Sequence, residues 1–234
     1  MSVNNGSEIS IADIKDNIAW IIDHTNLHPD ATKSDIEKLC KEALKWGTAA
    51  VCVHPYYVDI CSKILSDSDV EVCTVIGFPL GANKKEVKAF ETENALKDGA
   101  SELDMVINIG ALKNRQYDFV EHDIKAVVKS SGDKIVKVIL ETALLTKDEI
   151  IKAAEIAKIA GADFVKTSTG FAAEGATVEN VKLMRETVGK NLGVKAAGGI
   201  RDYQTALEMV KAGANRIGAS STAKIIAGGQ KQSS

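Results

Sequence analysis

The chain has 234 residues, of which 45% are hydrophobic and 26% charged, the composition of an ordinary globular protein with a full core. A formal net charge of −3 predicts no nucleic-acid or anionic-lipid partner, and no run of about 18 apolar residues predicts a membrane span. The four cysteines form no CxxC pair and no secretory signal is recognisable, so we expect reduced thiols in a cytoplasmic protein.

Short apolar runs alternate with helix-period segments along the whole chain. A short helix is expected near 10–17. Candidate strands follow at 18–23, 49–54, 70–76, 103–108, 135–141, 163–167, 193–197 and 216–218. Candidate helices lie near 34–46, 55–66, 84–98, 114–130, 147–160, 178–189, 202–212 and 220–227. Thr146 with Glu149 has the spacing of a capping box at a helix start, and Asn83 with Glu86 has it in looser form.

Strict alternation of strands and helices predicts a parallel sheet of the α/β class. Eight such units in one chain of this length favour a closed single-domain (β/α)₈ TIM barrel, with the short helix preceding it. The pattern alone leaves an open doubly wound sheet as an alternative. No linker divides the chain, so residues 1–234 are expected to form one domain, with flexible ends at 1–9 and 228–234.

Three lysines interrupt the apolar runs of consecutive predicted strands. Lys137, Lys166 and Lys195 lie in the fifth, sixth and seventh strands, and Asp104 lies in the fourth. A lysine inside a barrel must pair with a carboxylate, lose its charge or face the active-site end, where the strands terminate. Desolvation and a second nearby ammonium favour a neutral amine, which can attack a carbonyl to form an iminium. The pattern therefore indicates Schiff-base chemistry.

Glycine-rich turns follow the last two predicted strands, at Gly198-Gly199 and Gly218–Ser221. Glycine lets backbone N–H groups approach an anion, and barrels often bind phosphate in these two loops. Arg201 either adds charge there or lies on the solvated surface.

The same end of the barrel carries His24, His54, Cys52 and Cys73. These side chains lack paired ligand spacing and an acidic second shell, so we expect no metal site. His54 is interpreted as a strand-end hydrogen-bonding group, and Cys52 most simply as a small core residue.

Six segments at the predicted strand ends share one family pattern: Asp23–Leu27, Val51–Pro55, Gly77–Gly81, Glu102–Val106, Val165–Phe171 and Val194–Arg201. Together they resemble the deoxyribose-phosphate aldolases, with the similarity running from about residue 16 to 226. The resemblance implies reversible cleavage of 2-deoxy-D-ribose 5-phosphate to D-glyceraldehyde 3-phosphate and acetaldehyde, without a metal or organic cofactor. It also suggests a homodimer.

Roles for individual residues follow from the resemblance. Lys166 forms the carbinolamine and iminium, Lys195 favours its neutral amine, and Asp104 transfers protons. The phosphate would be held by Gly170, Gly198, Gly199, Gly218, Ser220 and Ser221. Asp23, Thr25 and Thr169 are candidates for the sugar hydroxyls or the proton relay, and Cys52 is a further candidate for the substrate pocket. For Lys137 and Glu141 a structural or electrostatic role is favoured.

One departure from the family is visible, because some members end in a tyrosine that assists proton transfer, whereas this sequence ends in Ser233-Ser234. Two alternative functions remain at this point. One is another lysine-dependent aldolase or transaldolase acting on a longer sugar phosphate. The other is a non-catalytic barrel that binds a phosphorylated ligand.

Overall fold

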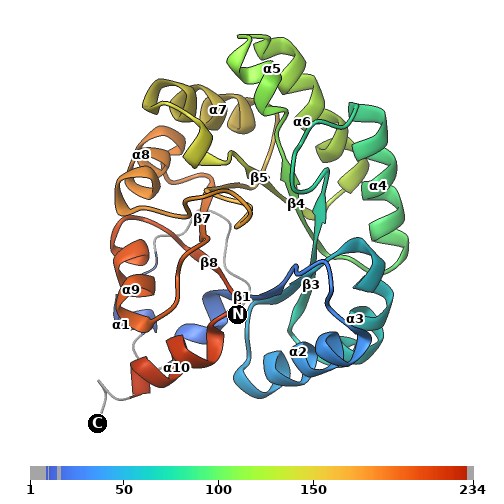
Figure 1. Cartoon of the computed structure of the whole chain (residues 1–234), viewed down its shortest axis with the longest axis vertical. Coiled ribbons are helices and arrows are strands. Elements are labelled where there is room, and N and C mark those ends of the chain that lie inside the picture. Colours follow the sequence, from blue (N-terminus) through green and yellow to red (C-terminus); the bar gives the residue numbers. More distant parts are fainter. Residues whose placement is uncertain (1–8, 10, 15–16, 231–234) are drawn as a thin grey trace.

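Eight parallel strands close into a barrel in which each strand pairs with its neighbours in chain order (Figure 1). The computed structural model describes residues 9, 11–14 and 17–230. The strands are β1 Ile22–Asn26, β2 Ala50–Val53, β3 Glu71–Ile76, β4 Glu102–Val106, β5 Ile135–Ile139, β6 Phe164–Lys166, β7 Gly193–Ala197 and β8 Arg216–Ala219. Because β1 also pairs with β8, the predicted closed barrel is confirmed and the open sheet is excluded.

A ring of helices surrounds the barrel (Figure 1). The α-helices are α1 Ile11–Ile14, α2 Lys33–Trp46, α3 Val58–Leu65, α4 Lys85–Lys97, α5 Ile109–Lys113, α6 Tyr117–Ser131, α7 Lys147–Ile159, α8 Val178–Val188, α9 Tyr203–Lys211 and α10 Thr222–Gln230. Three 3₁₀ turns join them: η1 Ile18–Ile21, η2 Pro55–Tyr57 and η3 Thr142–Leu144. In the described part of the chain, no helix is long and apolar enough to cross a membrane.

The first predicted strand is wrong in its first half. Ile18–Ile21 form η1, which begins where the Asn17 side chain accepts a hydrogen bond from the backbone N–H of Ala19. The strand follows at Ile22–Asn26 and carries mostly polar side chains. The apolar composition of Ile18–Ile21 is that of a buried strand, but these residues form a 3₁₀ turn that leads into β1.

Two helix boundaries also differ from prediction. The helix expected near 114–130 is α6, which begins three residues later at Tyr117. The short helix α5 before it was not predicted, and Arg115 lies between the two in the left-handed region at φ 56°. At α4 the N-cap is Lys84 without a side-chain bond, so the looser capping pattern at Asn83 is wrong, whereas the capping box at Thr146 is confirmed.

The ends of the chain are described only in part. Residues 228–230 belong to α10, which corrects the flexible tail expected from 228, and 231–234 lie outside the described residues. The same holds for 1–8. Within the expected helix near 10–17, α1 spans Ile11–Ile14 and residues 10, 15 and 16 are not described.

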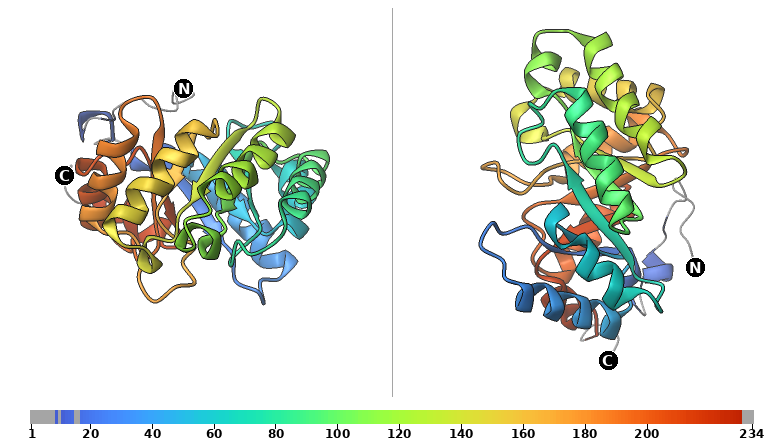
Figure 2. Two further views of the ribbon diagram at one scale, coloured as in Figure 1. Left: turned by 90° about the horizontal axis from the view of Figure 1, so that it is seen from above. Right: turned by 90° about the vertical axis from the view of Figure 1, so that its right-hand side faces the viewer.

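The barrel interior is divided between apolar and charged side chains. Beneath β1–β3 lies a small apolar cluster of Leu27, Ala50, Cys52, Cys73 and Val75, with Phe78 packed against it. Ionised side chains of β1 and β4–β8 fill the other part, while the larger apolar core lies between strands and helices. The loops after β1 (blue) and β6 (orange) project at the same end of the barrel (Figure 2), the end where active sites of this fold lie.

Candidate active site

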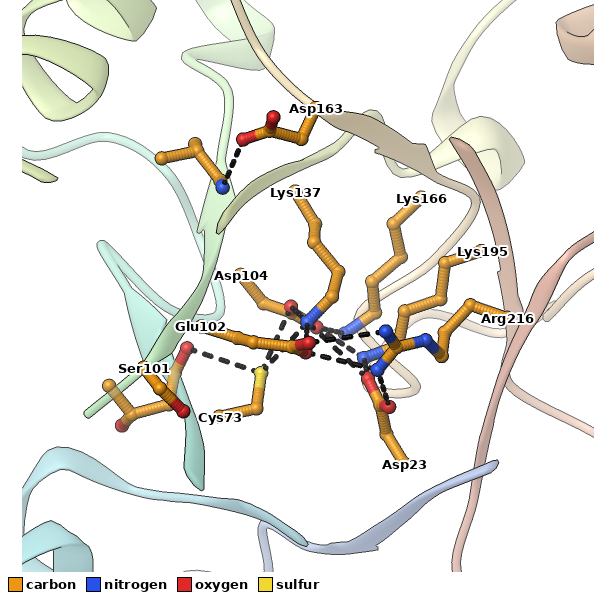
Figure 3. Close-up of polar contacts among 12 residues, drawn as sticks. Asp23, Cys73, Ser101, Glu102, Asp104, Lys137, Asp163, Lys166, Lys195 and Arg216 are labelled. Atoms are coloured by element: carbon orange, nitrogen blue, oxygen red, sulfur yellow. Dashed lines mark hydrogen bonds and ion pairs between the residues drawn. The ribbon is translucent and has the colours of Figure 1, made fainter. Parts of the chain in front are cut away.

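Strand register brings the predicted catalytic side chains together inside the barrel. Asp104 of β4 is the register partner of Lys137 of β5, and Lys166 of β6 is the partner of Lys195 of β7. Since alternate residues of a strand share a face, these positions all turn inward. Figure 3 shows the lysines converging on the carboxylates at the centre of the barrel.

Asp104 is the carboxylate on which all three lysines meet. Its Oδ2 accepts hydrogen bonds from the Nζ atoms of Lys166 and Lys195, each at 2.7 Å. Its Oδ1 lies 2.9 Å from Lys137 Nζ and accepts a bond of 3.1 Å from the Cys73 thiol. One carboxylate oxygen is therefore shared by the two lysines expected to act in catalysis.

Two further carboxylates and an arginine complete the charged layer. Asp23 pairs with Lys195 and, at 2.7 Å, with Arg216 Nη1. Glu102 Oε2 lies 2.5 Å from Lys137 Nζ, and both its oxygens bond to the guanidinium of Arg216 at 3.1 Å. We call these seven side chains the charged layer: Asp23, Glu102, Asp104, Lys137, Lys166, Lys195 and Arg216.

The charged layer keeps most of its members ionised. Burial by itself would raise the pKa of Asp104, but the three lysines bonded to it hold that pKa well below its usual range. Burial by itself would lower the pKa of Lys195, but Asp104 and Asp23 outweigh it and raise this pKa above its usual value. Lys195 is therefore a persistent ammonium group beside Lys166.

The charge of the layer is unbalanced. It contains four cationic side chains and three carboxylates, so the fully ionised layer carries one surplus positive charge. Loss of a proton from one lysine removes the surplus. Lys137 and Lys195 are completely buried, whereas Lys166 is 3% exposed and its side chain lines a pocket above the layer.

The pocket has a volume of about 370 Å³ and opens at the carboxyl ends of β1, β6, β7 and β8. This is a suitable size for a small ligand such as a sugar phosphate. Its lining consists of Thr25, Leu27, His28, Lys166, Thr169, Gly170, Phe171, Ala197, Gly198, Gly199, Ile200, Arg201, Gly218, Ala219 and Ser220.

Glycine is required at several places around the pocket. Gly170, Gly198 and Gly199 have φ values of 88°, 85° and 79°, which L side chains rarely adopt. The backbones of Gly175 and Gly198 approach so closely that a Cβ on Gly175 would lie 2.1 Å from the Gly198 carbonyl oxygen. The loops after β6 and β7 are therefore packed together, and both present backbone to the pocket.

A second carboxylate shapes the loop after β6. Glu141 has left a strand conformation and lies in the left-handed region at φ 56°. Its Oε2 accepts a bond of 3.2 Å from the backbone N–H of Thr169 and a short bond from the Thr169 hydroxyl, which in turn accepts from Phe171 N. Glu141 thus fixes the loop that carries Thr169 and Phe171 to the pocket.

The structure divides the predicted site residues into two levels. Eight of them line the pocket: Thr25, Lys166, Thr169, Gly170, Gly198, Gly199, Gly218 and Ser220. Asp104 and Lys195 lie directly beneath, within the charged layer. Arg201, left open by the sequence, also reaches the pocket.

Three predicted substrate contacts are not part of the pocket lining. Asp23 is completely buried, and its oxygens are occupied by Lys195 and Arg216. Cys52 is completely buried in the apolar cluster, in agreement with its interpretation as a core residue. Ser221 precedes α10, where its carbonyl oxygen accepts from Lys224 N. Direct contact of these three residues with the substrate therefore stays a prediction.

Sequence reasoning missed Glu102, Arg216 and the thiol contact of Cys73. A usable signal existed, because Glu102 lies two residues before Asp104 and Arg216 two before Gly218, on the same inward face. Their position at the first residue of a strand made them resemble solvated ends.

Two groups of side chains in the described residues carry metal-ligand atoms within 4.8 Å of one another: Cys52, Cys73 and Asp104, and Asp23, Cys73 and Glu102. Their carboxylates are already paired with lysine or arginine, so a bound cation would have to displace those cations. His24 and His54 bond elsewhere, the latter to the Leu27 carbonyl oxygen at 2.9 Å.

Comparison with known proteins identifies the family. The family model described as DeoC/LacD family aldolase matches residues 18–228, which include every strand of the barrel. The chain belongs to this aldolase family.

Individual relatives of this DeoC/LacD aldolase are similar over nearly their whole length. A deoxyribose-phosphate aldolase of Clostridium tetani is 64% identical over 210 residues, covering 89% of this chain and 97% of the relative. One of Thermococcus gammatolerans is 62% identical over 215 residues, covering 90% and 96%. Among solved structures, the tetrameric deoxyribose phosphate aldolase of Aeropyrum pernix is 35% identical with a TM-score of 0.86, covering 92% of each chain.

Proposed function

We propose that this aldolase reversibly cleaves 2-deoxy-D-ribose 5-phosphate to D-glyceraldehyde 3-phosphate and acetaldehyde through a Schiff base on Lys166. The observation that carries the proposal is that Lys166 and Lys195 share Asp104 Oδ2. Of the seven side chains in the charged layer, Lys166 alone lines the pocket. The names of relatives at 58–64% identity support the substrate.

The reaction begins with the attack of the Lys166 amine on C1 of the open-chain sugar. Release of the surplus proton of the charged layer provides that amine in its neutral form. The resulting carbinolamine loses water to form the iminium. Asp104, whose Oδ2 lies 2.7 Å from the Nζ atoms of both Lys166 and Lys195, transfers the protons of these steps, while Lys195 remains an ammonium group beside it.

Cleavage of the C2–C3 bond follows. The C3 hydroxyl loses its proton, its oxygen becomes the aldehyde of glyceraldehyde 3-phosphate, and the bonding electrons pass into the iminium to give an enamine. The enamine carbon then takes up a proton, and water hydrolyses the regenerated iminium to acetaldehyde and free Lys166. All the chemistry is supplied by protein side chains and water.

Phosphate binding is assigned to the loops after β6, β7 and β8. Gly170, Gly198, Gly199 and Ser220 present backbone and hydroxyl groups to the pocket, and Arg201 adds a positive charge. Thr25 and Thr169, which also line the pocket, are assigned to the sugar hydroxyls.

We further propose that the protein acts in the cytoplasm as a homodimer. All four cysteines are free and buried, as suits a reducing compartment. Two large apolar side chains are exposed, Leu80 at 74% in the loop after β3 and Phe90 at 64% on α4, and association of two copies would cover such groups. Light scattering after gel filtration measures the assembly.

Borohydride trapping tests the proposed reaction. The protein is incubated with acetaldehyde or 2-deoxyribose 5-phosphate, reduced with sodium borohydride and digested, and the modified peptide is identified by mass spectrometry. We expect an adduct on Lys166 that is lost in Lys166→Met and kept in Lys147→Met, which changes an exposed lysine of α7.

The alternatives give different results in the same experiment. A transaldolase-like enzyme would be trapped by dihydroxyacetone rather than acetaldehyde. A phosphate-binding barrel without catalysis would give no adduct on Lys166, and the Lys166→Met variant would bind the sugar phosphate almost unchanged.

A further inference from the structure

A hydrogen-bonded chain of side chains lies on the outer side of the barrel, behind the phosphate-binding loop of β8. His24 Nε2 lies 3.1 Å from Glu42 Oε2 of α2, and His24 Nδ1 lies 2.8 Å from Thr222 Oγ1, at the first residue of α10. His24 is 4% exposed and packs edge-on against Trp46, with ring centroids 5.3 Å apart. Neither His24 nor Thr222 lines the pocket.

The direction of the hydrogen bonds follows from the chemistry of the three groups. Burial lowers the pKa of His24, despite the opposing effect of Glu42, so the ring carries a single proton at neutral pH. A carboxylate can only accept, so that proton is on Nε2 and is donated to Glu42. Nδ1 is then an acceptor, and the Thr222 hydroxyl donates to it at 2.8 Å, with the Ala219 carbonyl oxygen as a second, longer contact of the same hydroxyl at 3.2 Å.

Thr222 closes a very short turn. Ala219 is the last residue of β8 and Thr222 the first of α10, so only Ser220 and Ser221 lie between them. His24 is also the register partner of Ala219 across β1 and β8. The histidine therefore holds both ends of the turn, through the sheet at one end and through the Thr222 hydroxyl at the other.

We propose that His24 and Thr222 are positioning residues for phosphate binding: together they fix the Ser220–Ser221 turn and the start of α10 against the pocket. This inference rests on the proposed function, because it assumes that the turn binds the substrate phosphate. The alternative is that the histidine only packs α2 against the barrel, in which case its loss would affect all substrates and the fold equally.

Comparing the phosphorylated with the unphosphorylated sugar separates a role in phosphate binding from a role in packing α2. We compare Thr222→Val, which removes the hydroxyl at nearly constant volume, with Thr222→Ser, which keeps it. His24→Phe removes the acceptor in the same way. For Thr222→Val and His24→Phe we expect KM for 2-deoxyribose 5-phosphate to rise between about three- and tenfold with kcat nearly unchanged, the effect of about one hydrogen bond. Thr222→Ser should restore the wild-type KM.

With unphosphorylated 2-deoxyribose, the kinetics measure the sugar contacts and the chemical steps without a contribution from phosphate binding. We expect its kcat/KM to stay within about twofold of wild type in every variant, whereas the affinity for inorganic phosphate, measured by calorimetry, falls in parallel with the rise in KM. Thr187→Val is the matched control, because its hydroxyl donates to a backbone carbonyl, that of Leu183, at 2.8 Å in α8 and far along the chain from the turn. It should change neither parameter.

Several results would overturn the inference. An equal loss for both sugars, or unchanged phosphate affinity in Thr222→Val, would show that the contact has no specific role in phosphate binding. A wild-type protein that cleaves neither sugar would refute the proposed function instead, and the calorimetric comparison would still decide whether the Thr222 hydroxyl supports phosphate binding.

Discussion

Arg216 is an inconspicuous residue in the sequence, yet it joins two of the three carboxylates of the charged layer. It bonds to Asp23 and to both oxygens of Glu102, at a site where its own side chain is 6% exposed. Both carboxylates and the lysines around them are fully or almost fully buried. Removing one partner from such a group leaves charges that water cannot reach.

Arg216→Met keeps an elongated side chain but removes the charge, and we expect the free energy of unfolding in urea to fall by about 3–5 kcal/mol. Lys63→Met is the control, because its ion pair with Asp59 is largely exposed and should contribute little. If the free energy of unfolding falls by the same small amount in both variants, burial of Asp23 and Glu102 does not depend on their bonds to Arg216.

At this scale the sequence revealed the lysines but not their partners. Lys137, Lys166 and Lys195 were recognisable because a lysine inside an apolar strand is unusual. The bond between Arg216 and Glu102 joins residues 114 positions apart, and it depends on strand tilt and side-chain reach that no local pattern encodes. Burial of Asp23 beneath the pocket was hidden for the same reason.

At the scale of the structural elements, β7 packs tightly against β8 at Gly218. A Cβ on this residue would lie 3.0 Å from Ala197 Cβ and 3.1 Å from Lys195 Cε. The end of the Lys195 side chain cannot move aside freely, because its Nζ is bonded to both Asp23 and Asp104. The absence of a side chain at Gly218 therefore supports the position of Lys195, in addition to opening the pocket.

We expect Gly218→Ala to lower kcat by about tenfold or more, since small displacements of catalytic groups are costly, while the protein remains folded. Gly132→Ala is the control: its φ of 63° makes the substitution strained, but nothing lies within 4 Å of its added Cβ. That variant should lose stability and keep kcat. Steady-state kinetics with unfolding curves separate the effects, and a normal kcat in Gly218→Ala would contradict the argument.

The order of the elements was predictable from periodicity, because a buried parallel strand is a short apolar run that a longer amphipathic segment follows. Gly193–Ala197 was predicted with the observed bounds. The first strand was not, since Asp23 and His24 are polar but buried, each satisfied by partners on other strands and helices. Such compensation exists only in the assembled barrel.

On the scale of the whole molecule, the charged layer determines how the fold responds to acid. The pKa values of Asp23 and Asp104 are lowered in the folded state, so these groups add stability that is complete above about pH 4, the unfolded value, and is lost as pH falls toward the folded values. Their protonation would leave unpaired cations in the core.

We therefore expect the free energy of unfolding to decline more steeply with falling pH below about pH 4 than between about pH 5 and 7. In the acid range the slope should correspond to uptake of at least two protons on unfolding, about 2.7 kcal/mol per pH unit. Urea titrations across the pH range measure this slope. A decline confined to the region above pH 4 would mean that these carboxylates are not the groups that stabilise the barrel.

The two levels of the site also bear on how new specificities can arise. Lys166 reaches the pocket, while the rest of the charged layer is sealed below it, and the rim is formed by separate loops that carry Phe171, Ile200 and Arg201. Substitutions on the rim can change which aldehyde fits without altering the number of buried charges. Lineages adapting to other acceptors should therefore accumulate changes on the rim and leave Glu102 and Arg216 untouched.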